Sequence, residues 1–202
     1  MSSFTPAYTR TNGYEGRGIY ACAPYDLGGA TYDGISRRIW PKWGGWPIID
    51  RSFALKLPCT GVDWSTLTAL HELFFMENFW RPATENGAIE DQDIANEVYD
   101  SSVNCGVHRA VGWMQIALNA SNERGNLWAN VSIDDHVGPA TIGAIARCCL
   151  WPQRRWLVLQ VMETLQRHHY LSLCLADSTQ EANLLGWYRL RLQWASQCPP
   201  AS

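Results

Sequence analysis

The chain has 202 residues, a length that suits one large domain or two small, closely packed ones. Hydrophobic residues make up 47% of it and charged residues only 17%, which excludes an intrinsically disordered chain. A formal net charge of −3 gives no electrostatic basis for binding nucleic acid, and no apolar stretch is long enough to span a bilayer. We therefore expect a folded protein with no nucleic-acid partner and no membrane insertion.

The first third of the chain is predicted to be irregular. Residues 10–35 are rich in Gly, Tyr and Asp without a sustained period, which indicates turns and short strands with a hairpin around 27–34. Residues 36–62 hold several prolines and glycines and are predicted to be loop. The tryptophans of this loop are Trp40, Trp43 and Trp46. Their rings either pack in the core or line a groove in which an indole face stacks on a sugar ring.

Helical periodicity begins at Asp63, the expected N-cap of a helix that Pro82 is predicted to stop. Further helices are predicted over residues 91–104, 107–119, 139–150, 153–175 and 180–194. Pro139 suits the first turn of its helix. The predicted fold class is mainly α, with a small β-hairpin element near the N-terminus.

The seven cysteines and the histidines give no sign of a metal site. The cysteines form no C-x-x-C pair and none stands at metal-ligand spacing from a histidine, so we expect no metal and no cofactor. They are either buried, reduced thiols or partners in one to three disulfides formed in an oxidising compartment. His71-Glu72 begins like a zinc-protease motif but lacks its second histidine, so we interpret it as helix surface.

A glycine-rich segment near the N-terminus holds the groups that glycosidic bond cleavage requires. One carboxylic acid must protonate the leaving oxygen, and a second group must stabilise the cationic centre or orient a water. Glu15 lies among glycines, and Asp26 and Thr31 follow it. Glycines let the backbone approach a substrate closely. Taken alone, two acids in a glycine-rich loop more often form a surface turn with solvated carboxylates.

This segment resembles the EGGY-type N-acetylmuramidases, glycoside hydrolase family 108, whose signature is E-G-G-Y, then D-P-G-G-x-T, then Y-G-I. The corresponding residues are Glu15-Gly16, Asp26-Leu27-Gly28-Gly29-Ala30-Thr31 and Gly34-Ile35-Ser36. Arg17 replaces the second glycine of the signature and Leu27 replaces its proline. Extra residues stand between the glutamate and the aspartate, so the chain resembles a divergent member.

The second half of the chain resembles the peptidoglycan-binding region of the same family. The matching positions are Asp100, Val103, Asn104, Gly106, Ala110, Gln115, Ala117, Leu118, Asp134, Gly138, Pro139, Thr141 and Gly186-Trp187-Tyr188-Arg189. The matches follow the family order and cover most of the chain. The resemblance implies a lysozyme-like catalytic segment over 1–90 and a helical peptidoglycan-binding segment over 91–202, which pack together or form one compact domain.

The resemblance also implies roles for individual residues. Glu15 is expected to be the general acid, with its pKa raised by partial burial. Asp26 and Thr31 are expected to orient a water or to steady the developing positive charge. The sugar contacts that we expect are Tyr20, Tyr32 and Asn104. Each of these three residues fits packing or capping equally well.

The predicted function is hydrolysis of the β-1,4 bonds of the bacterial cell-wall glycan. No signal peptide is visible in the first residues, so we expect delivery to the periplasm or cell wall by a secretion system or a phage holin. An antibacterial effector of a type VI secretion system is expected to have a cognate immunity protein as partner. The alternatives are a phage-type endolysin, a lytic transglycosylase and a non-catalytic peptidoglycan-binding protein.

Overall fold

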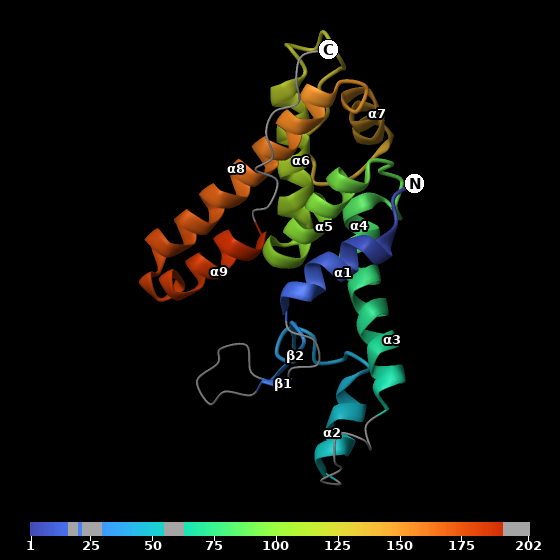
Figure 1. The fold of residues 1–202 in the computed structure, drawn as a ribbon, viewed down its shortest axis with the longest axis vertical. Coiled ribbons are helices and arrows are strands. Elements are labelled where there is room, and N and C mark those ends of the chain that lie inside the picture. Colours follow the sequence, from blue (N-terminus) through green and yellow to red (C-terminus); the bar gives the residue numbers. More distant parts are fainter. Residues whose placement is uncertain (16–19, 22–29, 55–62, 192–202) are drawn as a thin grey trace. The chain divides into compact units, whose positions relative to one another are not determined.

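The computed structural model describes residues 1–15, 20–21, 30–54 and 63–191. The chain forms two compact units. The smaller unit is Tyr8–Asn78, and the larger unit combines Met1–Ala7 with Phe79–Ser202. Helices dominate both units, and all strands of the described part lie in the smaller unit (Figure 1). The mainly α fold with a small β element near the N-terminus is thereby confirmed.

The smaller unit begins within one helix and ends within another. Its elements are α1 (Phe4–Glu15), β1 (Tyr20–Ala21), β2 (Thr31–Tyr32), β3 (Ile35–Ser36), α2 (Trp46–Ala54), α3 (Trp64–Phe75) and the start of a π-helical stretch (Met76–Trp80). The strands form one antiparallel sheet in the order β1-β2-β3.

A tight turn at Asp33 and Gly34 joins β2 to β3. Their φ angles are 45° and 84°. A two-residue loop with positive φ at both positions matches the twist of a hairpin, and Asp-Gly adopts it at little cost. The structure therefore contains a hairpin over residues 31–36, within the region where one was expected, and residues 27–29 of the expected hairpin lie outside the described residues.

The start of α3 is confirmed and its predicted end is wrong. Asp63 caps α3, because its carboxylate accepts a hydrogen bond from the backbone N–H of Thr66 at 3.0 Å. Beyond α3 the chain passes through the π-helical stretch and continues as α4 (Arg81–Thr84). Pro82 lies in the first turn of α4, where a helix needs no backbone N–H from it. The proline therefore begins a helix segment instead of stopping one.

Helices α1 and α2 correct the prediction that residues 10–35 and 36–62 are irregular throughout. Pro47 is the second residue of α2, so this proline also marks a helix start. In α1 the polar residues Thr11 and Asn12 are buried, with exposed fractions of 1% and 3%. Because the buried side of α1 is partly polar, hydrophobic periodicity could not reveal it, and packing determines the helix.

Aromatic side chains form the core of the smaller unit. The Trp43 ring stacks on Tyr32, with centroids 5.7 Å apart, and meets Trp46 edge to face at 5.1 Å. It also contacts the edge of Phe74 at 6.3 Å. Trp46 is 2% exposed, and its indole N–H donates to the carbonyl oxygen of Trp40 at 2.8 Å. Trp46 is therefore a core residue.

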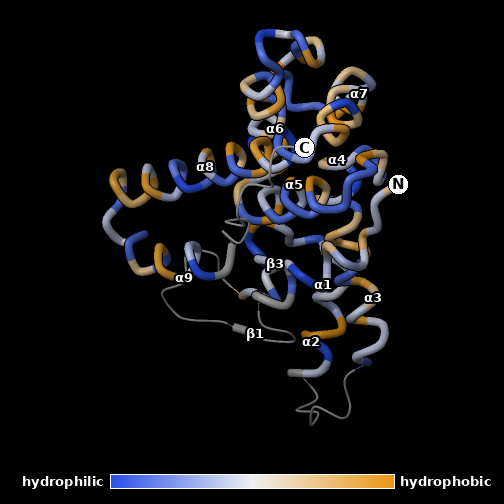
Figure 2. Tube along the Cα trace, turned by 45° about the horizontal axis from the view of Figure 1, so that its top comes forward, coloured by the Kyte–Doolittle hydropathy of each residue, from blue (hydrophilic) through white to orange (hydrophobic). Residues whose placement is uncertain are grey.

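The larger unit is helical. After α4 it contains α5 (Gln92–Cys105), α6 (Val107–Ser121), α7 (Pro139–Cys148), α8 (Pro152–Ala176), a 3-10 turn (Ser178–Gln180) and α9 (Glu181–Arg191). The helices predicted for this half of the chain are confirmed. Hydrophobic and hydrophilic residues alternate along α8 (Figure 2), and its buried side includes the polar residues Glu163 and Gln166 besides apolar ones. In the part of the chain described, none of the helices has the length and apolar character needed to cross a membrane.

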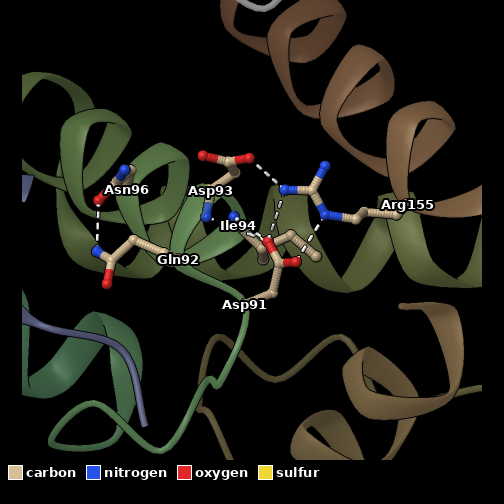
Figure 3. A network of polar contacts seen from close by, with 6 residues as sticks. All are labelled: Asp91, Gln92, Asp93, Ile94, Asn96 and Arg155. Carbon is tan, nitrogen blue, oxygen red and sulfur yellow. Dashed lines mark hydrogen bonds and ion pairs between the residues drawn. The ribbon is translucent and has the colours of Figure 1, made fainter. Parts of the chain in front are cut away.

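One ion-pair network joins the start of α5 to α8 (Figure 3). Asp91 caps α5 by accepting hydrogen bonds from the backbone N–H groups of Asp93 and Ile94. The guanidinium of Arg155 donates to both carboxylate oxygens of Asp91, at 2.6 and 3.1 Å, and also to the carboxylate of Asp93. Burial raises the pKa of Asp91, but the bonds from Arg155 and Ile94 outweigh it and hold the pKa below 3.8. This network therefore keeps Asp91 ionised while it caps the helix.

Two adjacent glycines allow a test of the aromatic core. A Cβ atom on Gly45 would lie 2.2–2.5 Å from three ring atoms of Trp43, whereas one on Gly44 would meet Leu70 at an ordinary 3.6 Å. We expect Gly45→Ala to lower the free energy of unfolding by about 1–3 kcal/mol, because the buried ring must move. Gly44→Ala is the control and should change it by less than about 0.5 kcal/mol. Urea denaturation measures both, and equal stabilities would contradict the packing described.

Candidate functional site

Six site residues were predicted from the sequence. Four of them lie in α1 or in the small sheet, and the structure describes these four at least in part. Glu15 is the last residue of α1, and Tyr20 starts β1; only their backbone is described. Asp26 lies outside the described residues. Tyr20 pairs across the sheet with Tyr32, so β1 and β2 bring these two positions together. Thr31 precedes Tyr32 in β2 and is half-buried.

Tyr32 is packed into the aromatic core. It is 6% exposed, and its ring stacks on Trp43 and meets the edge of His71 at 6.2 Å. Burial raises the pKa of its hydroxyl, and the charge of Asp33 raises it further. These contacts account for a packing role of Tyr32. A contact to sugar stays a prediction.

His71 is a buried polar centre that the sequence analysis assigned to the helix surface, and that assignment is wrong. It is 2% exposed. The Tyr8 hydroxyl lies 2.7 Å from its Nδ1, and its Nε2 lies 2.9 Å from the backbone carbonyl oxygen of Asp33. A carbonyl oxygen only accepts, so Nε2 carries the hydrogen and Nδ1 accepts from Tyr8. The imidazole thus connects α1, the hairpin turn and its own helix, α3.

The charge state of His71 follows from its surroundings. Burial lowers its pKa below the usual 6.5, while the hydrogen bond to the Asp33 backbone and the carboxylates of Asp33 and Glu72 oppose that shift only in part. The nearest carboxylate oxygen, on Asp33, is 3.5 Å from Nε2. At neutral pH the imidazole is therefore neutral, in agreement with the tautomer that its two hydrogen bonds require.

Asn12 is a second buried polar residue that the sequence analysis missed. It lies in α1, one helical turn before Glu15, and is 3% exposed. Both polar atoms of its amide lack a hydrogen-bond partner in the described structure. An unpaired buried amide is costly, so such groups are rare and call for a partner. The only sequence signal for it was an asparagine close to the expected acid.

A pocket of about 480 Å³ lies between the loop after the hairpin and α3. Its lining residues are Ile39, Trp40, Pro41, Lys42, Trp43, Gly44, Leu70, Leu73, Phe74, Glu77 and Asn78. Of the three loop tryptophans, Trp40 and Trp43 line this pocket and Trp46 does not. A lining that combines aromatic rings with charged and amide groups suits a ligand that has both an apolar face and polar substituents.

In the larger unit, several motif positions meet around one tyrosine. Asn104 donates from its amide to the hydroxyl of Tyr170, which also accepts from Gln166 at 2.9 Å. The Tyr170 ring stacks on Trp187, with centroids 4.7 Å apart. Asn104 and Trp187 both belong to the positions that resemble the peptidoglycan-binding region. Their shared contact with a residue that is 1% exposed shows that these positions hold α5, α8 and α9 together.

Gln115 binds a second group of residues that match the family motifs. It is fully buried in α6, and its amide nitrogen donates to the carboxylate of Asp134 at 2.8 Å and to the carbonyl oxygen of His136 at 2.9 Å. Its amide oxygen accepts from the backbone N–H groups of Asp134 and Asp135. One side chain therefore holds the loop that leads into α7, and Pro139 then starts that helix as predicted.

The described cysteines are reduced. Cys105, Cys148, Cys149 and Cys174 are free thiols, and the remaining three lie outside the described residues. Burial raises the pKa of Cys148 and of Cys149 to about 12. Because the thiolate is the reactive form, these two thiols are unreactive at neutral pH.

Comparison with protein families covers almost the whole chain. Residues 8–106 match the family model described as Glycosyl hydrolase 108. Residues 109–192 match a second model, described as Predicted Peptidoglycan domain. The chain belongs to glycosyl hydrolase family 108. As a member of this family with a C-terminal peptidoglycan-binding region, it is a glycoside hydrolase that acts on peptidoglycan.

The fold is similar to that of a solved structure from a bacterium. It is the structure of SagA from Brucella abortus, which is 18% identical to this glycosyl hydrolase 108 protein, with a TM-score of 0.57. The similarity covers 95% of this chain and 92% of SagA. At this level of identity it shows a shared fold alone. A comparison with curated proteins found no match.

The pKa of His71 predicts how acid affects the smaller unit. Because burial lowers this pKa, neutral His71 contributes stability above pH 6.5 that is lost as pH falls through the lowered value. We expect His71→Gln, which does not titrate, to lose less stability than the wild type between pH 7 and pH 5. His168→Gln removes an exposed histidine on α8 and should leave the loss unchanged. Urea denaturation at the two pH values measures these differences, and equal losses in all three proteins would contradict the assignment.

Proposed function

We propose that the protein is an N-acetylmuramidase that hydrolyses β-1,4 bonds of the peptidoglycan glycan, with Glu15 as the general acid. The observation that carries this proposal is the position of Glu15. It is the last residue of α1, within the part of the chain that matches glycosyl hydrolase 108, and it directly precedes the glycine-rich segment. The glycines that follow Glu15 in the sequence let the backbone approach a substrate closely, which suits a residue that must reach a glycosidic bond.

The proposed reaction needs two kinds of group. Glu15 donates its proton to the glycosidic oxygen as the bond breaks, and the sugar on the other side develops positive charge. Asp26 and Thr31 orient the attacking water or steady that charge. Water then supplies the hydroxyl group of the new reducing end, and its remaining proton returns the acid to its starting state.

The setting that we propose is delivery to the periplasm as an antibacterial effector, with a cognate immunity protein that protects the producing cell. The substrate supports this setting, because peptidoglycan lies outside the cytoplasm. A neighbouring gene for a small exported protein would support an effector. A neighbouring holin gene would instead support a phage endolysin.

The proposed roles predict an order of activity losses. We expect Glu15→Gln to lower the rate of cleavage of purified peptidoglycan by about 10²–10⁴-fold, because the amide cannot donate the proton. Asp26→Asn should also cost activity heavily. Thr31→Ala should cost least, about 2–10-fold, because it removes one neutral hydrogen bond. Release of soluble fragments measures the rates, and sedimentation with sacculi measures glycan binding, which Glu15→Gln should retain.

The control for these variants is Glu90→Gln, which removes an exposed glutamate between α4 and α5 and should keep full activity. If Glu15→Gln keeps near-normal turnover while Asp26→Asn is inactive, the acid has been assigned to the wrong residue. If all three site variants stay active, the catalytic group lies elsewhere.

A further inference from the structure

We propose that His71 is a positioning residue for glycan cleavage, which holds the hairpin that carries Thr31 at a set distance from the helix that ends at Glu15. The inference rests on the proposed function, because it assumes that Glu15 and Thr31 act on the same bond. His71 itself is not proposed to touch the substrate.

The first link runs from His71 to α1. The hydroxyl of Tyr8 donates to Nδ1 of His71 at 2.7 Å. Tyr8 lies in α1 two helical turns before Glu15. Because a helix is rigid, the hydrogen bond that fixes Tyr8 to α3 also fixes the distance between α3 and the C-terminal end of α1.

The second link runs from His71 to the hairpin. Its Nε2–H donates to the backbone carbonyl oxygen of Asp33 at 2.9 Å. Asp33 is the first residue of the turn, immediately after Thr31 and Tyr32 in β2. The acceptor is a backbone atom next to the strand, so this bond positions the strand itself and not only a mobile side chain.

The surroundings of His71 keep both links in place. Its ring lies 4.7 Å from the ring of Phe75, and the rings of Tyr8, Tyr32 and Trp43 meet it edge to face. Phenylalanine would fill the same space without desolvating two ring nitrogens. The contacts that require a histidine are therefore the two hydrogen bonds, and they join the two elements that carry Glu15 and Thr31.

Three substitutions separate the hydrogen bonds from the packing. His71→Phe keeps an aromatic ring and removes both bonds. His71→Gln places an amide N–H where Nε2 was, so it keeps the bond to Asp33 and loses the one to Tyr8. Tyr8→Phe loses only the bond between Tyr8 and His71. Ile49→Val, in α2, is the control, because it destabilises the same unit through its core and leaves both bonds intact.

The readout is kcat and KM on solubilised glycan strands, measured well below the melting temperature of every variant. We expect His71→Phe to lower kcat by about 10–100-fold with KM changed by less than about twofold, because a small misplacement of catalytic groups has this effect. His71→Gln and Tyr8→Phe should each lower kcat by about 3–10-fold, and by similar factors. Ile49→Val should lower the melting temperature and keep kcat.

Several results would overturn the proposal. One is a wild-type kcat in His71→Phe, and another is a wild-type kcat in both His71→Gln and Tyr8→Phe. A third is a loss of kcat in Ile49→Val as large as that in the His71 variants, which would make the effect one of stability alone. If His71→Phe does not fold, His71→Gln and Tyr8→Phe decide the question by the same criteria.

Glu15→Gln, measured in the same assay, separates this inference from the proposed function. If Glu15→Gln is inactive and the His71 variants keep kcat, only the positioning role is refuted. If Glu15→Gln is active, the proposed function fails, whatever the His71 variants show.

Discussion

The arrangement of the smaller unit depends on one neutral imidazole in an aromatic core. His71 accepts from Tyr8 and donates to the backbone of Asp33, so a single ring joins α1, the hairpin turn and α3. Around it, Tyr32 and Trp43 stack on each other and exclude water. In such surroundings a hydrogen bond is stronger than in water, and an unpaired polar atom costs more. The ring therefore has one favourable arrangement, in which both nitrogens are paired.

The sequence predicted the helices of the larger unit well, because their apolar residues recur with the helical period and Pro139 marks a start. Hydrophobic periodicity did not reveal α1, in which Thr11 and Asn12 are buried, nor α2, whose Pro47 looked like a loop signal. The burial of His71 was equally hidden. The aromatic residues that cover it come from distant parts of the chain, so no local pattern indicates it.

The candidate site could be predicted only through resemblance to a family. Glu15, Asp26 and Thr31 are ordinary residues in a glycine-rich stretch until the order of the motifs is recognised. The structure adds physical reasons for other motif positions. Gln115 holds the loop before α7 with four hydrogen bonds to loop atoms, and Asn104 meets Trp187 at the buried ring system of Tyr170. These positions stabilise the peptidoglycan-binding region.

The most direct test of the account is mass spectrometry of purified sacculi digested in water enriched in ¹⁸O. A hydrolase that cleaves at the muramic acid must release fragments with a reducing N-acetylmuramic acid end, and each new end must carry one ¹⁸O atom from the attacking water. The account predicts these fragments with the wild type and none with Glu15→Gln. Anhydro-muramic ends without ¹⁸O would show a lytic transglycosylase instead, and intact glycan strands would contradict glycosidic cleavage altogether.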